Sequence, residues 1–116
     1  MTYTRAILDF ASAPHTLPPQ VRADAERLLA DTLAVGVAAA PTPEVVKLCQ
    51  ASVGWDSGSE ARVFDGGMVP SQIAAFLNGF AIHCLEWDAV HEPAVVHALS
   101  VVMAVLLAAS DRAGGS

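Results

Sequence analysis

Residues 70–87 read PSQIAAFLNGFAIHCLEW, and their pattern predicts a helix. Apolar side chains recur every three or four residues, which is the spacing of one face of an α-helix. This face comprises Ile73, Phe76, Leu77, Phe80, Ala81 and Cys84. Pro70 and Ser71 suit the opening of such a helix. Asn78 and Gly79 are poor helix formers at its centre, so we expect a neighbouring element to pack closely there.

Three more helices are predicted on the N-terminal side of this stretch. Residues 2–13 carry apolar side chains at helical spacing. An amphipathic helix opens at Pro19 and ends before Pro41, because proline suits a first turn but interrupts a helix interior. Thr42 is then expected to cap a third helix over residues 42–55.

The rest of the chain adds one strand and one helix. Residues 61–64 form a short strand-like run, and the sequence Asp-Gly-Gly over residues 65–67 predicts a turn. Residues 88–93 are predicted to be a loop, and a fifth helix runs from about Val95 to Arg112. The fold class predicted from these patterns is all-α, with about five helices and one short strand.

Composition narrows the class of protein. The chain has 116 residues, of which 53% are hydrophobic and 16% charged, and its mean hydropathy is +0.46. Such apolar character fits a membrane protein, an obligate oligomer or a piece of a larger protein. The longest apolar stretch, residues 95–110, is shorter than the ~20 residues that a membrane span needs. Asp9 lies where an export signal would have its apolar segment, so no export signal is predicted. We therefore expect no membrane insertion and a cytoplasmic protein.

Charge and cysteine usage exclude other classes. The net charge is −6 and the six basic residues are scattered, so nucleic-acid binding is not expected. Cys49 and Cys84 are the only cysteines, and their spacing matches no metal motif. We expect two buried, reduced thiols.

Titratable residues gather in one window, HCLEWDAVHEPAVVH, over residues 83–97. It contains three of the four histidines of the chain together with Glu86, Asp88 and Glu92. The window joins the end of the fourth predicted helix to the start of the fifth. A helix N-terminus favours anions, so this junction suits a negatively charged substrate.

This window and the helix before it resemble the MmgE/PrpD family, which includes 2-methylcitrate dehydratase and cis-aconitate decarboxylase. The family typically reads L-N-G-x-x-A-H-x-L-D-[FWY]-D-D-x-H, then a short loop and H-P-[ST]. The matching residues here are Leu77, Asn78, Gly79, His83, Leu85, Trp87, Asp88, His91 and His97. The segments LPPQVRADAERLLADTLAVGVAA and ARVFDGGMVPSQIAAFLNG also look like the family, so the resemblance covers nearly the whole chain.

The resemblance implies an N-terminal part of a larger helical domain over residues 1–116. The remainder of that domain and a smaller α/β lid would be absent from this chain. It further implies a cytoplasmic homodimer in the full-length form, with a small polycarboxylate as substrate and no cofactor. The reaction implied first is dehydration of the 2-methylcitrate type. Decarboxylation or epimerisation is the alternative, and a non-catalytic helical interaction module or an inactive remnant is a second one.

The sequence departs from the family pattern at four positions. Glu86 replaces the usual aspartate, Ala89 a second aspartate, Val90 a threonine, and Ala98 the proline after the histidine. Losing the threonine hydroxyl leaves the substrate open, whereas the framework of acids and histidines is retained.

Four residues are predicted to be catalytic: His97, Asp88, His91 and Glu86. Dehydration needs a base beside a carboxylate and an acid for the leaving hydroxyl, and histidine suits either role. His97 is the predicted base, because a helix start favours its neutral form, with Asp88 or Glu86 holding the other ring nitrogen.

The residues of the same window also allow other roles. We expect His83 to be structural and Trp87 to belong to the core. His83, Asp88, His91 and His97 are also potential metal ligands, but their spacing matches no zinc motif, so no metal site is predicted.

Overall fold

The computed structural model describes residues 2–114, and it is predominantly helical. Five α-helices are present: α1 (Tyr3–Ser12), α2 (Pro19–Ala39), α3 (Pro43–Ser52), α4 (Ser71–Cys84) and α5 (Ala98–Arg112). Strands β1 (Ala61–Arg62) and β2 (Met68–Val69) form an antiparallel hairpin, and η1 (Glu92–Ala94) is a single 3₁₀ turn. The predicted all-α class is confirmed, with a two-stranded hairpin where one strand was expected.

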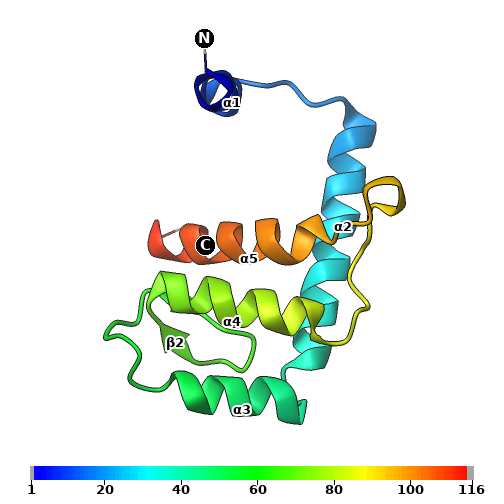
Figure 1. Cartoon of the computed structure of the whole chain (residues 1–116). Coiled ribbons are helices and arrows are strands. Elements are labelled where there is room, and N and C mark those ends of the chain that lie inside the picture. Colours follow the sequence, from blue (N-terminus) through cyan, green and yellow to red (C-terminus); the bar gives the residue numbers. More distant parts are fainter. Residues whose placement is uncertain (1, 115–116) are drawn as a thin grey trace.

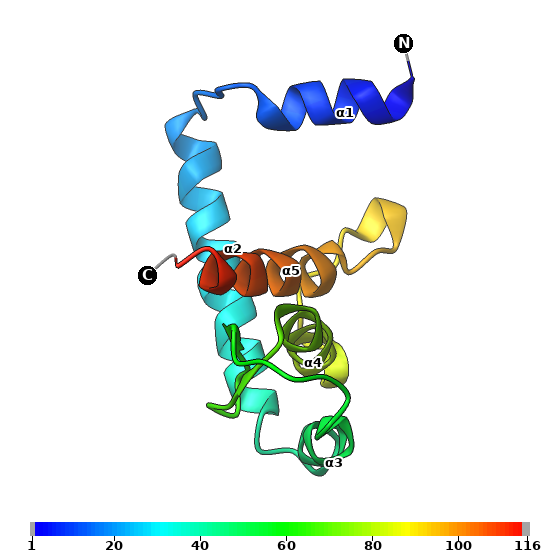
Figure 2. The same cartoon turned by 90° about the vertical axis from the view of Figure 1, so that its left-hand side faces the viewer.

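The fold is built around α4, which packs mainly against α5 and α2. In Figure 1, α3, α4 and α5 are stacked one above the other, and α2 runs across their ends. Figure 2 shows the same arrangement with α3 and α4 seen nearly end-on and α5 at an oblique angle. One apolar core cluster joins α4 to the hairpin and α5 through Ala61, Val63, Ala74, Leu77 and Ala108. A second joins α2, α3 and α4 through Ala39, Val45 and Ala81.

The two poor helix formers of α4 make the close contacts that the sequence predicted. Asn78 is 3% exposed, and its side chain accepts from the Phe64 amide (3.1 Å) and donates to the Arg62 carbonyl (2.9 Å). A Cβ atom on Gly79 would lie 3.2 Å from the Ser100 carbonyl oxygen. Asn78 therefore ties α4 to the hairpin, and Gly79 lets α5 approach.

The boundaries nearest the window differ from the prediction. The fourth helix ends at Cys84 rather than Trp87, and the fifth begins at Ala98 rather than Val95. Val95 has a left-handed backbone (φ 49°), and so does Glu86 (φ 53°), which interrupts both helical runs. Trp87 consequently lies in the loop with 67% of its surface exposed, so its expected place in the core is wrong.

Other local predictions were partly right. The strand prediction over residues 61–64 was too long, because Val63 already belongs to the turn and its amide donates to the Gly67 carbonyl. Thr42 does precede α3, but its hydroxyl donates back to the Ala39 carbonyl instead of capping the helix. Cys49 and Cys84 are free thiols that are half-buried rather than fully buried.

Much apolar surface remains exposed. Helix α1 has no buried residue, and both views show it apart from the other helices. On α5, Val101, Val102, Val105 and Leu106 are each about half exposed or more. Within the described residues, no single helix is long and apolar enough to cross a membrane; α2 and α3 together pass by length and composition but are bent by 83°.

Candidate functional site

The window of titratable residues becomes one compact cluster at the junction of α4 and α5. His83 lies in the last turn of α4, and His97 is the residue immediately before α5. Asp88 comes from the loop between them, and its side chain is completely buried. The ends of two packed helices thus bring together three residues that span 15 positions of the sequence.

Asp88 lies between the two imidazole rings. Its Oδ1 is 3.1 Å from His83 Nδ1, and its Oδ2 is 3.1 Å from His97 Nδ1. The two rings meet edge to face, with centroids 4.8 Å apart. Among residues 2–114, no lysine or arginine forms an ion pair with this carboxylate, so the histidines are its charge partners.

The two histidine contacts are not equivalent. His83 Nδ1 is hydrogen-bonded to Asp88. His97 Nδ1 is equally close, but it is not aligned as a hydrogen bond and remains a buried nitrogen without a partner. The contact between His97 Nδ1 and Asp88 is therefore electrostatic and is not a hydrogen bond. Since Nδ1 is buried while the side chain is 32% exposed, the accessible edge of the ring is the one that carries Nε2.

Two of the four predicted catalytic residues lie outside the cluster. The His91 amide donates to the Val96 carbonyl in an isolated β-bridge, and the His91 side chain is exposed. Glu86 is exposed at the turn that ends α4. Within the described residues neither makes an ion pair with Asp88 or with the two clustered histidines. Their catalytic roles stay predictions from the sequence.

Comparison with known families identifies the chain. The model of the MmgE/PrpD N-terminal domain matches residues 8–116, which is nearly the whole sequence. The protein belongs to the MmgE/PrpD family. No curated protein and no solved structure matches the chain. The family assignment confirms the resemblance seen in the sequence, and it places the chain among proteins related to lyases and dehydratases.

The MmgE/PrpD motif residues of this chain have different local tasks. Asn78 and Gly79 shape the packing of α4, whereas Asp88 and His97 belong to the cluster at the junction of α4 and α5. His83, expected to be structural, is a full member of this cluster. Its position five residues before Asp88 gave no signal, because the helix was predicted to continue to Trp87 instead of ending at Cys84.

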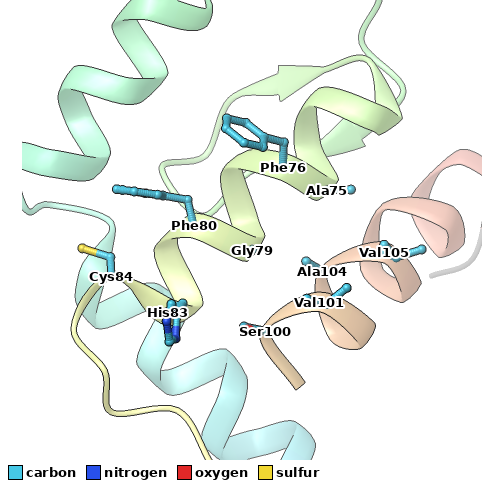
Figure 3. A pocket seen from close by; sticks show the side chains of 10 residues that line it. All are labelled: Ala75, Phe76, Gly79, Phe80, His83, Cys84, Ser100, Val101, Ala104 and Val105. Carbon is cyan, nitrogen blue, oxygen red and sulfur yellow. The ribbon is translucent and has the colours of Figure 1, made fainter. Parts of the chain in front are cut away.

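An apolar groove of about 500 Å³ lies beside the cluster, between α4 and α5. Figure 3 shows Phe76 and Phe80 from α4 and Val101 and Val105 from α5 along it, with His83 at one end. None of the six basic residues of the chain lines this groove. The groove therefore lacks the cations that a polycarboxylate would need.

The cluster also has the donors of a potential metal site. One ligand atom from each of His83, Asp88 and His97 lies within 4.8 Å of the others. Two imidazoles and a carboxylate are ligands that zinc accepts, and a fourth position would remain for water. The fold thus brings together three of the four potential ligands named from the sequence, and the absence of a resident metal remains a prediction.

The surroundings of Asp111, Arg62 and Cys49 shift the pKa values of these side chains. A hydrogen bond and ion pair with Arg62 hold the pKa of Asp111 below its ordinary value, and the same contact raises the pKa of Arg62. Burial, reinforced by the nearby Asp65 carboxylate, raises the pKa of the Cys49 thiol. The first pair is structural, because it fastens β1 to the end of α5.

Proposed function

We propose that this chain supplies part of the catalytic centre of a lyase that acts on a small polycarboxylate, with dehydration of the 2-methylcitrate type as the reaction. The observation that carries the proposal is the fully buried Asp88 carboxylate facing Nδ1 of His97 at 3.1 Å. A buried carboxylate is costly unless it is paired. The free-energy cost of burying the Asp88 carboxylate fits a role in orienting an imidazole that transfers a proton.

His97 is the proposed base. A carboxylate beside Nδ1 favours the tautomer with the proton on Nδ1, which leaves the lone pair on Nε2, the accessible nitrogen. Nε2 would take the proton from the carbon beside a substrate carboxylate. The electrons of that C–H bond form the double bond as the neighbouring hydroxyl leaves, protonated by an acid, as water.

His91 and Glu86 remain the proposed candidates for that acid, since both lie exposed on the loop beside His97. The cations that hold the substrate carboxylates are proposed to come from a longer protein. Support for a longer protein comes from the exposed apolar side chains of α5, which resemble a surface awaiting further helices. In the same way we propose a cytoplasmic homodimer for the full-length form and no activity for the 116-residue chain alone.

Decarboxylation and epimerisation are the alternatives. Both also begin at an atom beside a carboxylate, and the replacement of the family threonine by Val90 leaves the choice between them open. We retain them because no substrate-binding group of this chain distinguishes the three reactions.

The test uses a full-length protein carrying this sequence. We expect it to dehydrate 2-methylcitrate or a related hydroxy-polycarboxylate, measured by the ultraviolet absorbance of the new double bond. His97→Gln should lower turnover by roughly 10²-fold or more, which is the usual size of a general-base contribution. The melting temperature should change little, because glutamine keeps a hydrogen-bonding group.

Each other result has a distinct meaning. Carbon dioxide release or a change in optical rotation without a new double bond would favour the alternatives. Unchanged turnover in His97→Gln with a much lower melting temperature would make His97 structural and contradict its proposed role.

A further inference from the structure

The cluster at the junction of α4 and α5 contains a buried acid that lacks a lysine or arginine partner. The Asp88 side chain has no exposed surface, and within residues 2–114 no lysine or arginine pairs with it. Among the same residues, only His83 forms a hydrogen bond with this carboxylate. Burying a carboxylate is costly unless a cation or several strong donors offset its charge. The surroundings of Asp88 therefore favour a bound cation.

His97 adds a second unsatisfied group in the same place. Its Nδ1 is buried and has no hydrogen-bond partner, although it lies 3.1 Å from Asp88 Oδ2. The Nδ1 of His83 lies at the same distance from Asp88 Oδ1. Both imidazoles thus turn the same nitrogen toward one carboxylate. A single metal ion between them would coordinate the carboxylate and the lone pair of each Nδ1.

The three donors are close enough together for one ion. One ligand atom from each of His83, Asp88 and His97 lies within 4.8 Å of the others. Zinc lies about 2.0–2.2 Å from such ligands, which puts two ligands of a tetrahedral site roughly 3.4 Å apart. The widest separation must therefore shorten by at most about 1.4 Å when the ion binds. The His83 side chain is 47% exposed at the end of α4, so rotation of its ring can supply this movement.

The donor set selects the kind of ion. Magnesium and calcium prefer oxygen ligands, whereas two imidazole nitrogens and one carboxylate suit zinc and related transition metals. Three protein ligands leave a fourth position for water. Because both rings are partly exposed, the ion can exchange with solvent. Such a site binds zinc reversibly, which distinguishes it from the site of a resident metal cofactor.

We propose that His83, Asp88 and His97 form a reversible zinc site, and that zinc bound there inhibits the reaction. A neutral imidazole has one ring proton, and coordination of zinc at Nδ1 leaves that proton on Nε2. The Nε2 of His97 then has no lone pair with which to accept a substrate proton. The binding site stands on the geometry of the three residues, while the inhibition rests on the proposed function.

Cobalt(II) and zinc binding to the parent chain test the site without any substrate. Tetrahedral cobalt(II) absorbs visible light and serves as a spectroscopic substitute for zinc. We expect one equivalent of cobalt per chain to give this spectrum and zinc to displace it. His83→Ala and His97→Ala should each weaken binding by roughly tenfold or more, since loss of even an outer partner of a metal site costs that much. His91→Ala removes a histidine outside the cluster and should bind as the parent does.

Nitrogen-15 NMR of the parent chain locates the ion even if a variant fails to fold. Zinc should shift the Nδ1 signals of His83 and His97 and leave those of His15 and His91 in place. A parent chain that gives no cobalt spectrum would overturn the proposal. So would an equal loss of binding in His91→Ala, or zinc-induced shifts at His15 or His91 in place of the clustered pair.

Turnover of the full-length protein tests the inhibition. Saturating zinc should lower turnover by about tenfold or more, because it removes the general base, and a chelator should restore it. In His83→Ala, the turnover that remains should need roughly tenfold more zinc for the same inhibition. Unchanged or higher turnover with zinc bound at the cluster would overturn the inhibitory role. Absence of turnover in the zinc-free parent would refute the proposed function, while the cobalt spectrum would still decide the site.

Discussion

Asn78 shows how one side chain can hold two elements together. It sits in the middle of α4, where asparagine is unfavourable, yet it is almost fully buried and uses both its oxygen and its nitrogen. Its partners are the backbone groups of Phe64 and Arg62. Arg62 is the last residue of β1, and Phe64 lies two residues further along the chain. The propensity cost in the helix is thus offset by hydrogen bonds to backbone groups that would otherwise lack partners.

Asn78→Ala should therefore destabilise the chain by about 1–3 kcal/mol, because it removes both bonds and leaves the partly buried Phe64 donor and Arg62 acceptor without their partner. The measurement is urea unfolding followed by circular dichroism. Asn78→Asp is the matched variant, since it keeps an acceptor for the Phe64 amide but loses the donor to the Arg62 carbonyl. An alanine variant as stable as the parent would show that water replaces both bonds.

At this scale the sequence predicted part of the cluster. Either Asp88 or Glu86 was expected to hold the other ring nitrogen of His97, and in the structure Asp88 lies beside it. The role of His83 was missed, because it depends on where α4 ends. Helix α4 ends there because Glu86 has a left-handed backbone. Glutamate rarely adopts this conformation, so the sequence pattern did not predict it.

The contact between α4 and α5 sets the geometry of the site at the scale of elements. Gly79 faces the first turn of α5, where an added Cβ would lie 3.2 Å from the Ser100 oxygen and 3.5 Å from Ala104 Cβ. The same contact lies one turn from His83, so the helix spacing there also fixes the distance between the two histidines.

Gly79→Val should force α4 and α5 apart and destabilise the fold by about 1–3 kcal/mol, the usual cost of overpacking. Ala75→Val is the matched control, because Ala75 lies one turn earlier on α4 and borders the open groove. Thermal unfolding of the two variants should show a lower melting temperature for Gly79→Val only. Equal melting temperatures would mean that α5 shifts without cost.

The ion pair between the hairpin and α5 should make stability depend on acid. Arg62 lowers the pKa of Asp111, so the folded state favours the charged carboxylate. This contribution is fully present above the ordinary value near 3.8 and is lost as the pH falls through the lower value of the folded state. Arg62, whose pKa is raised, stays charged throughout this range.

Asp111→Asn should consequently be less stable than the parent at pH 7, and the difference should shrink as the pH falls below about 4. Melting temperatures measured across the acid range check this. Asp31→Asn removes the same charge from an exposed position on α2 and should leave the acid profile close to that of the parent. A constant difference between Asp111→Asn and the parent at all pH values would contradict the expected linkage.

Helix number and order could be predicted because apolar spacing and proline positions report on them directly. Helix α2 begins at Pro19 and ends at Ala39, before Pro41, as the sequence indicated. The hairpin could not be predicted in full, because strands of two residues are too short to show an alternating pattern. Strand β2 forms because the turn of residues 63–67 brings Met68 opposite Arg62.

On the scale of the whole molecule, the site and the exposed apolar surface adjoin each other. The groove between α4 and α5 is apolar and open, and His83 lies at one end of it. A covering helix would exclude water from the cluster and strengthen the interaction of Asp88 with both histidines, since electrostatic interactions grow as the surroundings become less polar. The same covering helix would therefore bury both the exposed apolar side chains of the groove and the cluster around Asp88.

This arrangement predicts that the 116-residue chain associates with itself, because large exposed apolar patches favour contact with one another. Light scattering coupled to sizing chromatography should give a mass above 12.0 kDa that rises with concentration. The double variant Val101→Glu, Val105→Glu should shift the chain toward the monomer. Both valines are more than half exposed, so the melting temperature should fall little. Val53→Glu adds charge at an 82% exposed position outside the groove and should leave association nearly unchanged. A parent chain that is monomeric at every concentration would contradict the prediction.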